Sequence, residues 1–376
     1  MLNPKKTSIG FVAIITVLAL AIVALAGCGN GGTTTTAAGN GGTTTTAAGE
    51  VYKFAESNPV ASNQHQMAFE YGKREMCKLL GAEFVSANAE LSPDKQVSDI
   101  DTFIQMGVAG ISSWTLDQGA ATAVYQRAQD KGIPVVTENS PGDFVTTVFI
   151  QEQNVTRVAQ EDAAKWFAEL IPGAKIFIIG GPPVPYILYV TRNMEIAAEE
   201  ADLTVLSRQD NLTDQADGAQ VIVQDLLTAH PDVQAIWCFN DRSALGASAA
   251  VRGAGKTVWD ASKPDEPGII ITGMNGTQEA LEAIQAGVIS ATYEGQSEQV
   301  GAAQIELLHR IASGEMTGDE IPSVIVCPYR RWDGSNIADA IFPLQREIKL
   351  GILDEFMAYG TDPATMDDFL EFVRTL

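Results

Sequence analysis

Short apolar runs alternate with longer segments in which apolar residues recur every three or four positions, from residue 51 to about residue 327. The short runs are typical of buried β-strands, and the longer segments are typical of helices with one apolar face. Gly and Pro residues separate these segments and mark short turns. Repeated strand and helix units with short turns require parallel sheets covered by helices on both faces, so the pattern predicts an α/β protein.

The pattern divides into two lobes and a tail. In the first lobe, strands are predicted at 51–55, 82–86, 108–113, 133–137 and 148–150, and helices at 64–80, 92–106 and 117–131. In the second lobe, strands are predicted at 174–180, 203–207, 233–238, 268–274 and 288–293, and helices at 156–170, 190–200, 217–229 and 277–286. A helix at 297–313 and a strand at 323–327 have no sheet of their own. In the tail, helices are predicted around 344–350 and 367–375, and we expect them to pack against the outside of a lobe.

The first 50 residues do not show this alternation. Lys5 and Lys6 precede an apolar run from residue 9 to residue 26, which ends in Leu-Ala-Gly-Cys at Cys28. This ending resembles a bacterial lipobox, which implies a lipoprotein signal at 1–28 that is cut before Cys28, a lipidated Cys28 and a place on the extracytoplasmic face of the cell membrane. The run is also long enough for an uncleaved membrane-spanning helix. Residues 29–50 include two copies of GNGGTTTTAA and predict a disordered tether, because Gly, Thr and Ala bury too little surface to fold.

Charge and composition exclude several classes of function. The chain has 376 residues, of which 47 are acidic and 24 basic, so its formal net charge is −23. This excess repels phosphate backbones, and we expect no nucleic-acid partner. The three histidines are scattered, none of the common hydrolase or metal-binding spacings occurs, and Cys77, Cys238 and Cys327 allow at most one disulfide. We therefore expect no catalytic activity, no cofactor and no metal.

Candidate chemistry gathers where strands end. The strand at 233–238 leads into a polar corner with Asn240 and Asp241, which precedes an Ala-rich helix. In open α/β sheets, ligands bind outside the carboxyl ends of the strands. An amide donates and accepts hydrogen bonds and a carboxylate accepts from two hydroxyls, so this pair suits a neutral ligand with many hydroxyls. The alternative for Asp241 is a helix N-cap.

The sequence around this corner resembles a known family. His-Pro-Asp-Val-Gln-Ala at 230–235, a hydrophobic strand, and Asn-Asp-x-x-Ala-Leu-Gly-Ala at 240–247 follow one another as in the ribose-type substrate-binding proteins of bacterial ABC importers. The resemblance implies a type I periplasmic-binding-protein fold, with two doubly wound parallel-sheet lobes joined by a multi-strand hinge. It implies an N-terminal lobe of 51–150 and about 297–325 and a C-terminal lobe of 151–296 and about 326–345. The family's core usually ends near this point, so we expect residues 346–376 to be an added helical extension. The implied partners of the monomer are a sugar or polyol, an ABC permease and its ATPase.

The resemblance also places ligand groups after the strands of the first lobe. Asn58 matches an Asn that reaches the sugar, and its alternative is a turn-forming role. Trp114 stands where the family often has Asn and offers an indole to cover a sugar face, unless it is a core residue. Asn139 and Ser140 take the places of the family's Asp-Arg pair, and Glu138 either replaces the acid or is exposed. The loss of this charged pair argues against ribose itself.

In the second lobe the resemblance points to four further residues. Arg192 matches an Arg that reaches into the cleft, with a surface charge as the alternative, and Tyr186 lies in the Pro-rich loop before it. Asn275 replaces a ligand-binding Asp, which keeps the acceptor and removes the charge. The family's hinge Gln falls one residue before Gln296, which makes Gln296 a candidate with Glu294 as its alternative.

These candidates are mainly amides, hydroxyls and aromatics, which suit a monosaccharide or sugar alcohol. We therefore expect a lipid-anchored capture protein whose lobes close over the ligand. A ligand-presenting sensor body for a membrane receptor and a sugar-processing enzyme are the alternatives. A DNA-binding regulator with the same lobes would need a basic helix-turn-helix where this sequence has a signal and a neutral tether.

Overall fold

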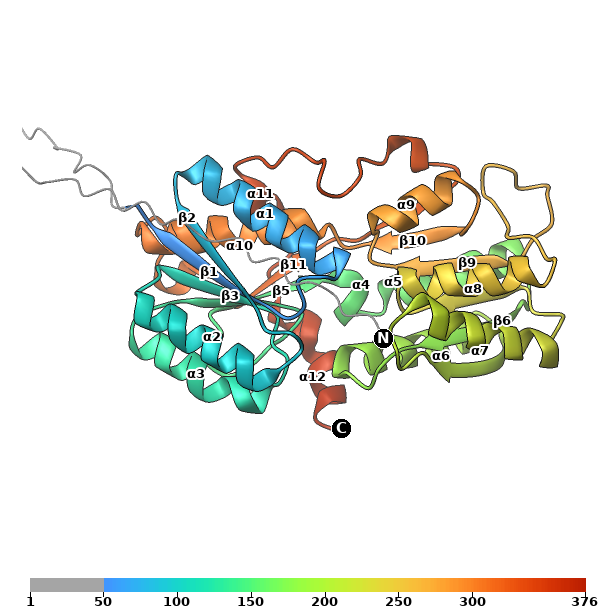
Figure 1. Ribbon diagram of the computed structural model, residues 1–376, viewed down its shortest axis with the longest axis horizontal. Helices are drawn as coiled ribbons and strands as arrows, with labels where there is room; N and C mark the ends of the chain where they lie inside the picture. The colour runs from blue at the N-terminus through green and yellow to red at the C-terminus, as the bar shows by residue number, and fades with distance from the viewer. Residues whose placement is uncertain (1–50) are drawn as a thin grey trace, which may run out of the picture. The chain divides into compact units, whose positions relative to one another are not determined.

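The computed structural model describes residues 51–376, and the predicted signal, Cys28 and tether lie outside this range. The first lobe contains β1 (Lys53–Asn58), α1 (Gln64–Leu80), β2 (Glu83–Asn88), α2 (Pro93–Met106), β3 (Gly110–Ser113), α3 (Gln118–Asp130), β4 (Val135–Glu138) and β5 (Thr147–Gln151). The chain later adds α10 (Ser297–Ala312), the 3-10 turn η1 (Gly318–Glu320) and β11 (Val324–Cys327) to this lobe. The strands form one parallel sheet in the order β11-β5-β4-β3-β1-β2 (Figure 1).

The second lobe is built in the same way. It contains α4 (Glu152–Val155), α5 (Val158–Leu170), β6 (Lys175–Gly180), α6 (Pro185–Glu200), β7 (Thr204–Asp210), α7 (Ala216–Ala229), β8 (Ala235–Cys238), α8 (Asp241–Gly253), β9 (Ile270–Met274), α9 (Gln278–Gln285), β10 (Ala291–Glu294) and β12 (Arg330–Asp333). Its sheet has the order β12-β10-β9-β8-β6-β7, and only β12 runs antiparallel to its neighbour. The extension adds η2 (Ile337–Asp339), α11 (Ile352–Tyr359), η3 (Pro363–Met366) and α12 (Asp367–Val373).

Each sheet is covered on both faces, as a parallel sheet requires. In β8, the fully buried Trp237 packs in the same apolar cluster as Met194 and Tyr293. Its neighbour Ile236 packs in another cluster with Val223, because successive residues of a strand point to opposite faces. The predicted fold class, two doubly wound α/β lobes, is confirmed.

Local signals in the sequence set several helix ends. Ser92 accepts a hydrogen bond from the backbone N–H of Lys95 (3.3 Å), and Pro93 begins α2. Gly81 ends α1 in the left-handed conformation, at φ 66°, which costs a residue without Cβ little. Gly81 thus sets where the chain turns from α1 towards β2, and Ser92 sets where the loop after β2 ends and α2 begins.

The lobes are joined by several segments. The chain crosses between them after β5, after β10 and after β11, and once more between η2 and α11. Cys77, Cys238 and Cys327 are buried and form no disulfide among the described residues. No helix in the range 51–376 is both long and apolar enough to cross a bilayer.

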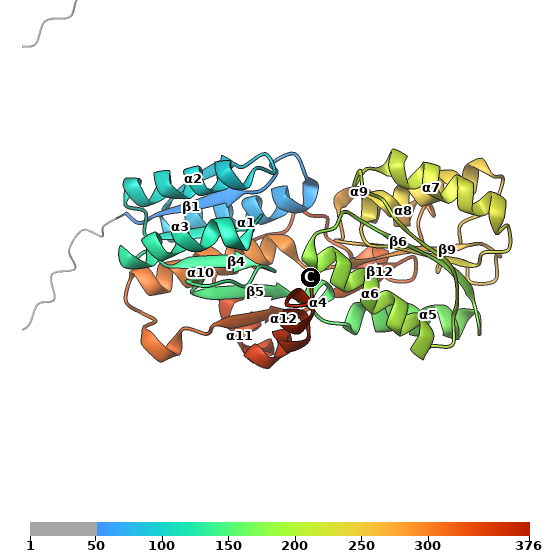
Figure 2. The ribbon, with the colours of Figure 1, turned by 90° about the horizontal axis from the view of Figure 1, so that it is seen from below.

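The structure differs from the sequence-based elements after residue 328. Residues 330–333 form the edge strand β12, which charged residues conceal from an apolar pattern. The helix predicted around 344–350 is wrong, because α11 begins only after Gly351. The tail also contacts more than one lobe: Leu353 packs with the first-lobe core, and Phe369 of α12 packs against Tyr189 of α6 with ring centroids 5.2 Å apart. Figure 2 shows α12 beside α6.

Candidate functional site

Polar residues from both lobes meet at the crossings between them. Asn139 donates from Nδ2 to Oε1 of Gln151 (3.0 Å), and the backbone N–H of Gln151 donates to Asn139 Oδ1 (2.8 Å). The Gln151 Nε2 group then donates to the carbonyl of Gly295 (2.9 Å) and to Ser297 Oγ (3.1 Å). Gln151 therefore ties the first crossing to the second, and Asn139 positions it.

Gln153 lies beside this network and lacks partners. Its side chain is fully buried, yet neither Nε2 nor Oε1 has a hydrogen-bond partner among the described residues. The side chain lies against Gly295, where an added Cβ would be 2.0 Å from Gln153 Nε2. A buried amide without partners costs about 1–3 kcal/mol, so its position calls for a polar group from outside the chain.

The second lobe contributes a wall around the start of α8. Asn240 is the N-cap of this helix: its Oδ1 accepts from the backbone N–H of Ser243 (2.9 Å), and its Nδ2 donates to Asp214. Asp214 is half-buried, and this burial raises the pKa of its carboxyl group. Burial, and then the charge of Asp214, raise the pKa of the Tyr186 hydroxyl, so Tyr186 stays neutral.

Asp241 is buried and serves the second lobe internally. Its carboxylate accepts from Thr292 Oγ1 (2.5 Å) and from both the backbone N–H (2.8 Å) and Oγ1 (3.0 Å) of Thr277. Burial raises the pKa of Asp241 to about 7, against the effect of these donors. The carboxylate thus holds the end of β8 to the loop after β9 and to β10.

Two contacts join the lobes across the gap between them. The rings of Trp114 and Tyr186 meet edge to face with centroids 5.7 Å apart. Gln64 Nε2 donates to Glu279 Oε1 (2.8 Å). Both contacts combine a residue from the first lobe with one from the second, so the structure shows the lobes drawn together.

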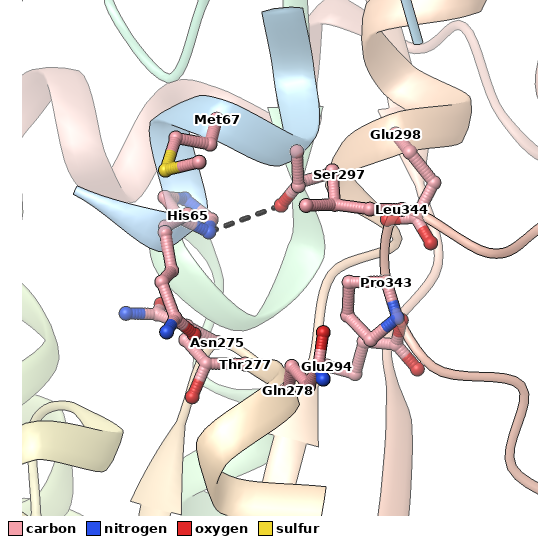
Figure 3. Close-up of a pocket in the computed structure, with 13 residues that line it drawn as sticks. His65, Met67, Asn275, Thr277, Gln278, Glu294, Ser297, Glu298, Pro343 and Leu344 are labelled. Atoms are coloured by element: carbon pink, nitrogen blue, oxygen red, sulfur yellow. Dashed lines mark hydrogen bonds between the residues drawn. The ribbon is translucent and has the colours of Figure 1, made fainter. Parts of the chain in front are cut away.

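A cavity of about 140 Å³ lies beside the second contact (Figure 3). The start of α1 lines one side with His65, and Asn275 lines the other. His65 Nδ1 lies 3.0 Å from Ser297 Oγ, and burial lowers the pKa of His65 to about 4. The imidazole is therefore neutral at neutral pH. A second, smaller hollow is lined by Asn63, Asn240 and Asn275.

The structure brings only some of the predicted residues together. Trp114, Asn139, Tyr186, Asn240 and Asn275 lie at the crossings or in the contacts and hollows between the lobes. Asn58 ends β1 and Ser140 follows β4, and both residues are buried. Asn58 Oδ1 accepts from the backbone N–H of Val60 (2.9 Å), and the carbonyl of Ser140 accepts from Thr137 Oγ1 (2.7 Å).

Three predicted ligand groups have other partners. Glu138 is fully buried within the first lobe, where it accepts from Gln304 Nε2 (2.8 Å) and lies 3.5 Å from Lys73 Nζ. Arg192 is exposed, and its guanidinium lies over the ring of Phe372 in α12, 5.5 Å from the ring centroid. Gln296 donates to the carbonyl of Pro328 (2.9 Å) at another crossing. In this structure each of these three side chains is therefore engaged with another part of the chain.

Sequence reasoning missed several residues at the site. Asn63, Gln64 and His65 open α1, and the N-cap role of Asn63, which accepts from the His65 backbone N–H (2.9 Å), was a signal that could have found them. Nothing local marks Gln153 or Asp214, whose surroundings depend on the crossings. Among residues 51–376 no group of His, Cys, Asp and Glu side chains could hold a metal ion.

Comparison with known proteins identifies the family. A family model described as a periplasmic binding protein domain matches residues 54–316. The ribose import binding protein of Bacillus subtilis is 27% identical over 256 residues, which cover 68% of this chain and 79% of that protein. A solute-binding protein of an ABC transporter from Actinobacillus succinogenes, solved with D-allose, superposes with a TM-score of 0.67 at 20% identity, covering 77% of this chain and all of that one (100%). Another, from Bacillus halodurans with bound myo-inositol, gives 0.64 at 21% identity, covering 77% and 96%. The chain therefore belongs to the periplasmic binding protein family.

Proposed function

We propose that this protein captures a monosaccharide or a sugar alcohol between its lobes and delivers it to an ABC permease. The unpartnered amide of the buried Gln153 is the observation that carries the proposal. An amide that offers both a donor and an acceptor is satisfied by a hydroxyl, which can accept and donate in turn.

The chemistry around the gap favours an uncharged ligand. His65 is neutral at neutral pH, and the Trp114 and Tyr186 rings present apolar surface that suits the C–H face of a sugar. The relatives support the same class, since they are named for ribose or were solved with D-allose or myo-inositol.

The hinge amide that the family resemblance places at position 295 has a substitute in this chain. Gly295 leaves the space that Gln151 and Gln153 fill with their side chains. Gln151 uses its Nε2 on the second crossing, whereas Gln153 keeps its polar atoms for a ligand. We assign Gln153 as the hinge amide of this protein.

Ligand contacts to both lobes stabilise the closed arrangement by the difference in affinity between the closed and the open form. The closed form then docks on the permease, whose ATPase drives import. The lipid anchor at Cys28, which lies outside the described residues, holds the protein at the extracytoplasmic face of the membrane. A Cys28→Ala variant is expected to leave the membrane fraction.

A calorimetric titration with D-ribose, D-allose, myo-inositol and xylitol tests the proposal. We expect one of these classes to bind, and Gln153→Ala to weaken that binding by about 1–3 kcal/mol. Gln129→Ala is the matched control, because Gln129 is exposed on α3. Absence of binding to every sugar and polyol would refute the ligand class, whereas unchanged binding by Gln153→Ala would refute the site.

A further inference from the structure

The extension after β12 forms an additional connection between the lobes. Phe342 packs with the core of the second lobe, and Ile348 and Leu353 join the core of the first. Residues 343–351 therefore cross from one lobe to the other, and Figure 1 shows this segment running from the side of α9 to α11. The family model ends at residue 316, so this crossing lies outside the matched domain.

Arg346 is the buried charge of this crossing. Its Nη1 atom lies 2.9 Å from Glu298 Oε1 and also pairs with Glu294 Oε1. The Trp332 indole N–H donates to the other oxygen of Glu294. The backbone carbonyl of Arg346 accepts from the Tyr71 hydroxyl of α1 (3.3 Å). One residue of the extension thus contacts both lobes.

The two carboxylates lie on either side of a hinge segment. Glu294 ends β10 in the second lobe, and Glu298 lies in the first turn of α10 in the first. Between them, Gln296 has a positive φ of 54°, so the chain turns sharply there. Both carboxylates are buried, and a single guanidinium offsets their mutual repulsion.

A rotation of the lobes would have to change the backbone between Glu294 and Glu298 and so separate their carboxylates. We propose that Arg346 is a positioning residue of the hinge, which holds this segment in the closed arrangement and limits how far the lobes open. This inference rests on the proposed function, because it assigns a role in ligand capture to a residue that touches no ligand.

The rest of the extension supports the same role. In α12, Phe369 packs with Val148 and Val326 of the first lobe and with Tyr189 of the second. Figure 2 shows α12 between α11 and α6. The extension thus holds the two lobes together at a second place. Pro343, the first residue of the crossing, lines the same cavity as His65 (Figure 3).

The experiment measures the distance between the lobes without any ligand. Spin labels at Gln129→Cys in the first lobe and Asp225→Cys in the second occupy exposed positions, whereas Cys77, Cys238 and Cys327 are buried. In pulsed dipolar spectroscopy of the ligand-free protein, Arg346→Met is expected to shift the distance distribution towards longer distances. Arg374→Met, at an exposed position near the C-terminus, is the matched control and is expected to leave the distribution unchanged.

The affinity of the Arg346→Met variant for the sugar or polyol that binds the wild-type protein is a second test of the inference. When only the closed form binds tightly, the apparent dissociation constant rises by the factor by which the closed population falls. A purely structural role of Arg346 would lower thermal stability without this proportional change. If Arg346→Met does not fold, Arg346→Gln repeats the test, because it keeps a polar side chain and removes the charge that pairs with the carboxylates. A folded variant with the wild-type distance distribution would overturn the inference, and this result is independent of whether any sugar binds.

Discussion

Substitution of Asn240 by Ala tests whether the contacts of this side chain with the start of α8 and with Asp214 stabilise the second lobe. The side chain makes two contacts: Oδ1 accepts from the Ser243 backbone N–H (2.9 Å), and Nδ2 donates to Asp214. Loss of an N-cap costs about 0.5–2 kcal/mol. Loss of the donor leaves the half-buried Asp214 carboxylate unpaired, which costs about 1–3 kcal/mol. Alanine removes both contacts at once, so we expect a total loss of about 1.5–5 kcal/mol in the free energy of unfolding.

Urea denaturation followed by circular dichroism measures this loss. Asn240→Ser is the informative comparison, because serine caps a helix about as well as asparagine but is too short to keep the bond to Asp214. We expect Asn240→Ser to lie between wild type and Asn240→Ala. Calorimetric titration with the ligand then separates stability from binding.

The two measurements can contradict the assignment in different ways. Wild-type stability of Asn240→Ala would show that neither contact contributes, and the structural role would be wrong. Weaker binding with unchanged stability would show that Asn240 serves the ligand directly and not the helix. We expect the stability loss, together with weaker binding that follows from a displaced Asp214.

Three further predictions concern buried charges and the aromatic contact. Lys73→Met leaves the fully buried carboxylates of Glu56 and Glu138 without a cation, so we expect a loss of about 3–5 kcal/mol in urea denaturation; equal stability would refute the ion pair. The raised pKa of Asp241, about 7, means that its protonated form stabilises the fold below pH about 4 and that this stability is lost as pH rises through 7. Asp241→Asn should therefore reduce the fall in unfolding free energy between pH 4 and 8, by at most about 1.4 kcal/mol per pH unit; parallel pH profiles would contradict this. Trp114→Ala should weaken ligand binding in calorimetry while Trp114→Phe keeps most of it, and equal binding by all three proteins would exclude a role for the ring.

The sequence by itself determined the alternation of strands and helices and the polar corners after the strands. These features depend on neighbours within a few residues, because apolar periodicity, helix caps and turn residues act locally. Asn240 is an example: it follows a strand and precedes a helix in the sequence, and these neighbours alone predict a polar corner there. The motif around it also carried the family resemblance, which the family model over residues 54–316 confirms.

Only the tertiary structure decided which polar side chains lie between the lobes and which are paired inside a lobe. Glu138 and Lys73 are 65 positions apart, yet they pair inside the first lobe, so a carboxylate predicted for the ligand is used for folding. Gln153 has no local signal, and its lack of partners follows from the crossing at Gly295. Arg346 lies in a tail without strong periodicity and finds its carboxylates only because the chain crosses back. Burial and pairing between distant segments set these roles, and a one-dimensional pattern does not record them.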